Sequence, residues 1–241
     1  MRILRFLFAA ALLCAAVVCV RLSNWQMHRL ARRQARNARV LHVRALPPVV
    51  LAARGLAALP DSLDGVAARA AGRYDAPRSV ILHHRYHDGS PGIGVLTPLV
   101  LPGDTAAVLV DRGWLPSDDG LRAPWRASLD TGEAAVSGRL EILRATPDRG
   151  SPVFLPAGSA GPADTVWLAA DPAALAPRFP YRLAPFCLVQ EPGPGAPRVP
   201  LREPAEPLSE GPHRGYAVQW LLFATAFTAA SVYVAFAPRR R

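Results

Sequence analysis

The chain has 241 residues, about half of them hydrophobic, and a formal net charge of +10 that comes from arginine alone because the sequence contains no lysine. The arginine clusters flank two apolar segments near the ends of the chain, whereas a nucleic-acid binder would gather them on one recognisable module. Three cysteines without a CxxC pair argue against a disulfide-bonded domain and a cysteine metal site, and the absence of a GxSxG elbow argues against a hydrolase. We therefore predict a membrane protein that binds no nucleic acid.

The first apolar segment is short for a membrane span, since only residues 6–20 are free of charge. Arg5 and Arg21 can extend it by snorkelling, and Trp25 supplies an interfacial anchor. A cleaved signal peptide is the alternative, because Arg2 and Arg5 precede an apolar stretch of suitable length. No small-x-small cleavage site precedes Arg21, which favours a first transmembrane helix over residues 1–24.

Residues 25–46 are predicted to continue as a basic juxtamembrane helix, since residues 25–40 contain no proline or glycine. Arginines recur there at spacings of three and four, which places them on one helical face. Such a face suits anionic lipid head groups or the acidic surface of a partner, and a merely solvated face is the alternative. The arginines are Arg29, Arg32, Arg33, Arg36 and Arg39.

Residues 47–190 are predicted to form one extracytoplasmic domain of predominantly antiparallel β-structure. Short strand-like runs alternate there with glycine- and proline-containing turns. The runs cover residues 49–52, 80–84, 93–101, 106–112, 135–143 and 183–190. Only residues 172–176 are predicted to be helical within this stretch, and the loop over residues 146–163 is predicted to be mobile.

Seven prolines in residues 191–212 predict an extended, semi-stiff connector that returns the chain to the membrane. Residues 216–237 then carry no charge and are long enough to cross a hydrocarbon core of about 30 Å. Residues 213–241 are therefore predicted to be a second transmembrane helix with a basic tail that ends in Arg239, Arg240 and Arg241. Two spans place both termini on the same side of the membrane, and we predict the cytoplasmic side.

Three histidines in one predicted strand, His83, His84 and His87, offer nitrogen ligands for a metal ion. Successive side chains of a strand point to opposite faces, so His84 points away from the other two. No second cluster completes a coordination shell, and exposed hairpin histidines are therefore favoured over a metal site.

The sequence Arg112-Gly113-Trp114 ends a strongly apolar predicted strand. Glycine permits a tight bend there, and the tryptophan can fold back over the core. A structural or partner-binding role is favoured for these residues. The alternative is that Arg112 binds an anionic group such as a propionate.

A histidine, His213, lies in the first turn of the second predicted span, where an imidazole is costly unless it faces protein, water or a ligand. Tyr216, Ala217 and Trp220 share its helical face. This face offers a ligand nitrogen, flanking rings and a small residue that leaves room for a flat macrocycle or for close helix packing. An ordinary aromatic belt at the membrane interface is the alternative.

A buried amide in the same span, that of Gln219, needs a hydrogen-bonding partner. That partner is predicted either on the first helix, near Trp25 and Gln26, or on another protein.

Four motifs of the chain resemble those of the surfeit-locus (Surf/Shy) cytochrome c oxidase assembly factors. They occur in that family's order and between the same two end-placed helices, so the resemblance covers nearly the whole chain. The motifs are Trp25-Gln26 followed by Arg29, GVLTPL at residues 94–99, VDRGWLP at residues 110–116, and HRGYAVQW at residues 213–220.

The resemblance implies two transmembrane α-helices that flank an extracytoplasmic β-rich domain in the bacterial inner (plasma) membrane. It implies a chaperone, not an enzyme, that helps to place haem, in particular haem a, into the catalytic subunit of a haem-copper terminal oxidase, with His213 as the iron ligand. The partners implied are that subunit, the lipid bilayer and, as a further candidate, a haem-synthesising membrane enzyme. The alternative is a membrane-anchored scaffold that contacts oxidase subunits without binding a cofactor.

Overall fold

The computed structural model describes residues 2–54, 56, 63–103, 105–117, 125–143, 166–167, 170–193, 199–205 and 207–237. These residues form two compact units. The helical unit comprises Met1–Leu41 and Pro207–Arg241, and the β unit comprises His42–Glu206. The predicted mobile loop over residues 146–163 lies outside the described residues.

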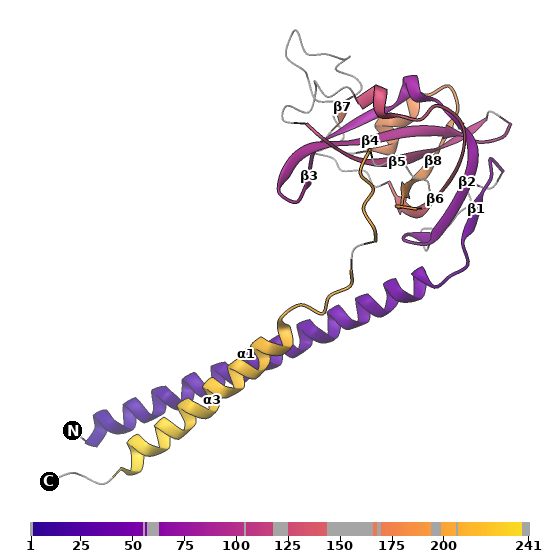
Figure 1. The fold of residues 1–241 in the computed structure, drawn as a ribbon. Helices are drawn as coiled ribbons and strands as arrows, with labels where there is room; N and C mark the ends of the chain where they lie inside the picture. The colour runs from indigo at the N-terminus through magenta and orange to yellow at the C-terminus, as the bar shows by residue number, and fades with distance from the viewer. Residues whose placement is uncertain are drawn as a thin grey trace. The chain divides into compact units, whose positions relative to one another are not determined.

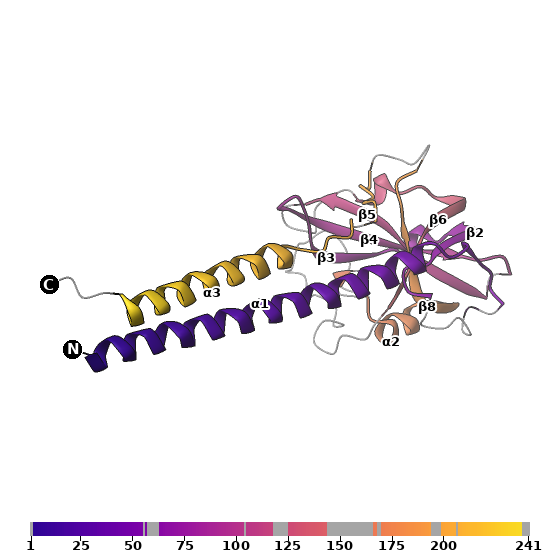
Figure 2. The same ribbon diagram turned by 90° about the horizontal axis from the view of Figure 1, so that it is seen from below.

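The helical unit consists of α1 (Arg2–Arg44) and α3 (His213–Phe236), which run antiparallel and side by side (Figures 1 and 2). Both helices are long and apolar enough to cross a membrane. The paired part of α1, from Arg5 to Gln26, spans about 32 Å at 1.5 Å per residue, close to the thickness of a hydrocarbon core. α1 continues without a break through the predicted juxtamembrane segment.

Small residues line the contact between the two helices and bring their backbones close together. Two serines then bridge the pair, since Ser23 Oγ donates to the Ala217 carbonyl at 2.9 Å and Ser231 Oγ donates to the Ala9 carbonyl at 2.8 Å. The small residues on α3 therefore serve helix packing. The buried small apolar residues are Ala9, Ala16, Cys19, Ala217 and Ala224, each 6% exposed or less.

A basic side chain closes the far end of the helix pair. Arg5 Nη2 donates to the carbonyl oxygens of Val234 at 2.7 Å and Ala237 at 3.0 Å. The last carbonyls of a helix have no partner within the helix, so this arginine caps α3 from the neighbouring helix. Arg5, which the sequence places at the end of the apolar stretch, is therefore also hydrogen-bonded to the end of α3.

The β unit is an eight-stranded sheet in the order β1-β2-β6-β8-β5-β4-β3-β7. Its domain is rich in β-structure as predicted, but the sheet is mixed, because the pairs β1–β2, β3–β7 and β5–β8 are parallel. The strands are β1 (Val49–Leu51), β2 (Ala67–Tyr74), β3 (Val80–His87), β4 (Ser90–Val100), β5 (Ala106–Pro116), β6 (Gly132–Ile142), β7 (Val166–Trp167) and β8 (Arg182–Gln190). The short helices are α2 (Pro172–Leu175) and the 3-10 turns Ala76–Arg78, Trp125–Ser128 and Ala176–Arg178.

An additional pairing between β2 and β4 closes five of the strands into a ring. The end of β2 pairs with β4 through Arg73 and Val100, while its full length pairs with β6. Strands β2, β6, β8, β5 and β4 thus form a small barrel around a core cluster that includes Leu99, Val108 and Leu188, all fully buried. This closure leaves β5, which carries the VDRGWLP motif, between β4 and β8.

Candidate functional site

The end of the helix pair where α3 begins holds a fixed imidazole. His213 Nδ1 lies 2.9 Å from Gln26 Oε1 on α1, and the histidine is half-buried. An amide oxygen only accepts hydrogen bonds, so the imidazole must donate from Nδ1. In its neutral form the ring therefore carries its lone pair on Nε2. This is the arrangement in which a histidine ligates a metal through one nitrogen while a neighbouring acceptor orients the other.

Nε2 of His213 lies beside the last residues of the connector. Gly211, just before α3, has φ +70°, and a Cβ placed there would lie 3.6 Å from His213 Nε2. Of the aromatic residues predicted to flank the histidine, Tyr216 is 48% exposed and Trp220 is half-buried against Phe223, with 5.8 Å between the ring centroids. The imidazole and the two rings lie on one side of α3 because they recur at spacings of three and four.

The structure separates Ala217 from this exposed surface. Ala217 is 2% exposed because it packs against α1 at Ser23, so its methyl group is not available to a ligand beside the intact helix pair. Of the two partners predicted for Gln219, the first helix is the wrong one: Gln219 is exposed, and Gln26 bonds to His213 instead. A partner for Gln219 on another protein stays a prediction.

The Trp25 motif lies at the same level of the helical unit. Trp25 is 51% exposed, and the guanidinium carbon of Arg29 lies 5.3 Å from the centre of its ring. An exposed indole with a cation over its face suits the membrane interface, where one side of the residue is apolar and the other is wet.

In the β unit, Arg112 is a buried ion-pair residue. It is 1% exposed, stacks over Tyr74 with 4.1 Å between the guanidinium carbon and the ring centre, and pairs with Asp130 at 3.1 Å. Burial raises the pKa of Tyr74. Burial, reinforced by the charge of Arg112, lowers the pKa of Arg202, which is 5% exposed. The partners that the structure gives Arg112, Tyr74 and Asp130, come from within the β unit.

The two residues after Arg112 hold the connector against β5. Trp114 and Leu201 exchange backbone hydrogen bonds of 2.8 and 2.7 Å. Gly113 has φ +111°, and a Cβ there would overlap the Leu201 carbonyl oxygen. Only glycine fits both this conformation and this close approach, so Gly113 allows the connector to add a short antiparallel bridge to the strand.

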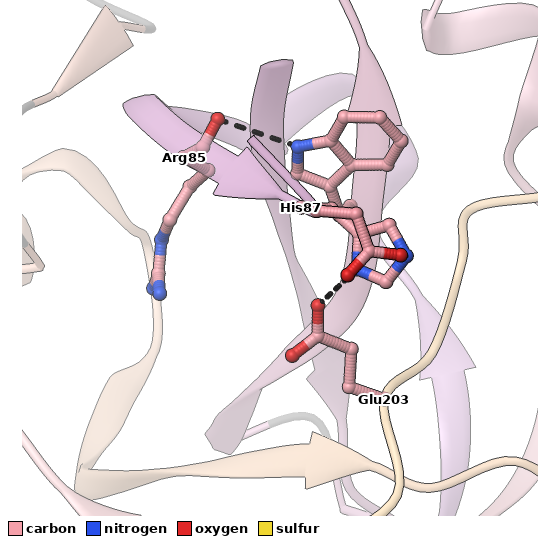
Figure 3. A network of polar contacts seen from close by, with 5 residues as sticks. Arg85, His87 and Glu203 are labelled. Carbon is pink, nitrogen blue, oxygen red and sulfur yellow. Dashed lines mark hydrogen bonds and ion pairs between the residues drawn. The ribbon is translucent and has the colours of Figure 1, made fainter. Parts of the chain in front are cut away.

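A polar network extends this attachment to the end of β3 (Figure 3). His87 Nδ1 lies 2.6 Å from Glu203 Oε1, and the His87 ring lies 5.3 Å from that of Trp114. Trp114 Nε1 donates to the Arg85 carbonyl at 3.3 Å (Figure 3). His87 thus binds the connector, an attachment that the strand pattern alone did not indicate. Among the described residues no group of three His, Cys, Asp or Glu side chains is placed to hold a metal ion.

A carboxylate beneath this network shapes the β5 bend. Asp111 Oδ1 accepts a hydrogen bond of 2.9 Å from the Gly113 amide, and its other oxygen lies 3.9 Å from Arg85 Nη2. Burial raises the pKa of Asp111, while Arg85 opposes the shift. The motif VDRGWLP is thus a structural unit in which each polar residue has a partner inside the β unit.

One known family matches the chain over most of its length. The model of the SURF1 family matches residues 13–225, which include the whole β unit and the part of each long helix nearest to it in sequence. The chain belongs to the SURF1 family. No curated protein gives a significant match to its sequence.

Membership of the SURF1 family gives the chain a role in cytochrome oxidase assembly, and members of this family are assembly factors rather than known enzymes. The two apolar helices fit a membrane-anchored member of the SURF1 family. Within this SURF1 chain, sequence reasoning identified His213 and Gln26 separately, but missed that they bond to each other and that Leu201 and Glu203 attach the connector to the motif around Trp114.

Proposed function

We propose that the chain carries haem a to the catalytic subunit of a haem-copper oxidase, and that His213 holds the haem iron through Nε2. The observation that supports this proposal best is the hydrogen bond between His213 Nδ1 and Gln26 Oε1. It fixes the tautomer and ring orientation that iron ligation needs, and it comes from the other helix of the pair.

The position of the site suits an amphipathic cargo. Haem is a flat apolar ring with two carboxylates, so it belongs at a membrane boundary with the ring inward and the propionates toward water. His213 begins α3, and Trp25 marks the same level on α1. Trp220 and Tyr216 offer apolar ring surface on the membrane side of the imidazole, and arginines follow on the opposite side of Trp25.

Release matters as much as binding, because a carrier must hand its haem to the oxidase. In this proposal His213 is the protein's one ligand to the iron. A single protein ligand holds haem more weakly than two opposed histidines, so transfer to a site with firmer ligation is favourable.

This function requires the β unit and the His213 end of the helix pair to lie on the outer side of the bacterial plasma membrane, with both termini in the cytoplasm. The partners are then the oxidase catalytic subunit and a haem-synthesising membrane enzyme that supplies the cargo. The rival proposal is a scaffold that contacts oxidase subunits without carrying haem.

The absorbance spectrum of the protein, purified from cells that make haem a, distinguishes the carrier from the scaffold. The carrier should show a Soret band that persists through purification and disappears after extraction of haem. Purified protein without a Soret band, from cells whose oxidase contains haem a, would refute the carrier and favour the scaffold.

A further inference from the structure

A row of arginines on α1 forms no ion pair with the described residues of the helical unit. We call Arg29, Arg32, Arg36 and Arg39 the arginine face; all four side chains are exposed. Their spacings of three and four residues place them in one line along the helix. The row begins one turn after Trp25 and continues almost to the end of the unit at Leu41.

The connector covers a different flank of α1. Ser209 and Glu210 bond there to Arg33, Gln34 and Asn37. Arg33 Nε, for example, donates to the Ser209 carbonyl at 3.0 Å. The α3 side of α1 lies on the same flank, through Gln26 and Ser23. The arginine face therefore points away from both neighbours that α1 has within its unit.

No acidic residue of the helix balances these charges. The first 60 residues of the chain contain neither aspartate nor glutamate. Within the part of the chain that the structure describes, Arg32, Arg36 and Arg39 take part in none of the ion pairs. Like charges three and four residues apart repel one another on a helix, and acidic groups docked against them would remove this repulsion.

The length of the row decides between lipid and protein as the source of those acidic groups. At 1.5 Å per residue, Arg36 and Arg39 lie about 16 and 21 Å along the helix from the interfacial Trp25. The head-group layer on each side of a bilayer is only about 5 to 8 Å thick. A helix tilt of about 20° shortens these distances by less than a tenth. Head groups can therefore reach Arg29 and Arg32, whereas the outer half of the row stands clear of them.

We propose that the arginine face docks an acidic, elongated surface on the part of the oxidase catalytic subunit that projects from the membrane. Guanidinium groups pair with carboxylates in a planar, two-bonded geometry, so a row of them favours carboxylates at a matching spacing. This inference rests on the oxidase partner proposed above, but it does not depend on haem binding.

Photo-cross-linking in cells tests the docking directly. A photoreactive amino acid replaces Ala35, which lies beside Arg32 and Arg39 on the helix and is exposed. The same amino acid at Gln34, on the connector flank, is the matched position. We expect Ala35, and not Gln34, to cross-link to an acid-rich segment of the catalytic subunit, identified by peptide mass spectrometry. A cross-link only to lipid, only to the chain's own β unit, or to nothing would overturn the proposal.

Charge variants in the same cells test the chemistry. The triple variant R32Q/R36Q/R39Q should lower the yield of the Ala35 cross-link by about ten-fold, because three charge pairs are lost together. R32K/R36K/R39K should keep most of it. A control triple of exposed arginines in the β unit, R54Q/R69Q/R73Q, should leave it unchanged. An unchanged yield in R32Q/R36Q/R39Q contradicts the proposal, as does an equal loss in the control triple.

The haem absorbance of each purified variant keeps this proposal separate from the proposed function. R32Q/R36Q/R39Q should retain its Soret band while it loses the cross-link. A wild-type protein that cross-links to the subunit but contains no haem would refute the carrier and leave the docking intact.

Discussion

Replacing His213 with alanine should reduce the haem that co-purifies with the protein to roughly a tenth of the wild-type amount or less, because it removes the protein's ligand to the iron. The helix pair should survive this change, since Ser23, Ser231 and Arg5 still join α1 to α3. The measurement is the Soret absorbance per mole of protein after purification from cells that make haem a.

Two further variants sharpen that experiment. His28 on α1 is exposed and lies close in sequence to Gln26, so His28→Ala is the matched control and should keep the wild-type absorbance. Gln26→Leu keeps the ligand but loses the acceptor that orients it, and should weaken haem affinity by about 10- to 100-fold. Full absorbance in His213→Ala, or equal losses in His213→Ala and His28→Ala, would show that this imidazole is not the ligand.

Gly113→Ala should detach the connector from β5. The added Cβ would overlap the Leu201 carbonyl oxygen, and the residue would also have to adopt φ +111°. We expect a loss of about 1–3 kcal/mol from backbone strain alone, and a further loss from the broken bridge between Trp114 and Leu201. Hydrogen exchange followed by mass spectrometry should show faster exchange of the amides in residues 199–205.

Gly103→Ala is the matched control for this effect. Gly103 has a similar φ of +100°, but a Cβ there would meet nothing within 4 Å. It should therefore cost only the backbone strain and leave exchange in residues 199–205 at the wild-type rate. If both variants speed exchange in residues 199–205 equally, the close approach of Leu201 is not the reason why position 113 requires glycine.

The strands that could be predicted from the sequence are those with large apolar side chains. Residues 93–101 and 106–112 read as strands because leucine and valine dominate them. In the structure, residues 93–100 lie in β4 and residues 106–112 lie in β5. Both strands are longer than predicted, because their pairing continues past glycines that resemble turn positions, to Gly92 of β4 and Pro116 of β5. Hydrophobic content thus identified the core strands but not their ends.

β2 could not be predicted, because its sequence AARAAGRY has no β-branched residue and few large apolar ones. It is a strand because Ala68, Ala70 and Tyr74 alternate inward against the other strands. Gly72 allows its backbone to approach that of β4, where any Cβ would overlap the Val100 carbonyl. The closure of the barrel by β2 is therefore a tertiary effect, invisible to local propensity.

The candidate site was predictable in part for a similar reason. An imidazole at the start of an apolar span is costly without a partner, and this cost identified His213. The partner itself, Gln26, is 187 residues away in the chain. The bond between them depends on the axial register of the two helices, which the sequence pattern does not give. The helical spacing of residues 213–220 did not distinguish a ligand-binding role of Ala217 from helix packing. In the structure Ala217 packs against α1, where its carbonyl accepts a hydrogen bond from Ser23.

The haem a content of the assembled oxidase tests most directly the claim that His213 carries haem to that enzyme. The comparison uses a strain without the native gene that carries wild-type, His213→Ala or His28→Ala protein at equal levels. We predict that the purified catalytic subunit from the His213→Ala strain contains as little haem a as that from the strain with no copy, whereas His28→Ala restores the wild-type amount. A catalytic subunit with its full haem a in the His213→Ala strain would contradict the claim.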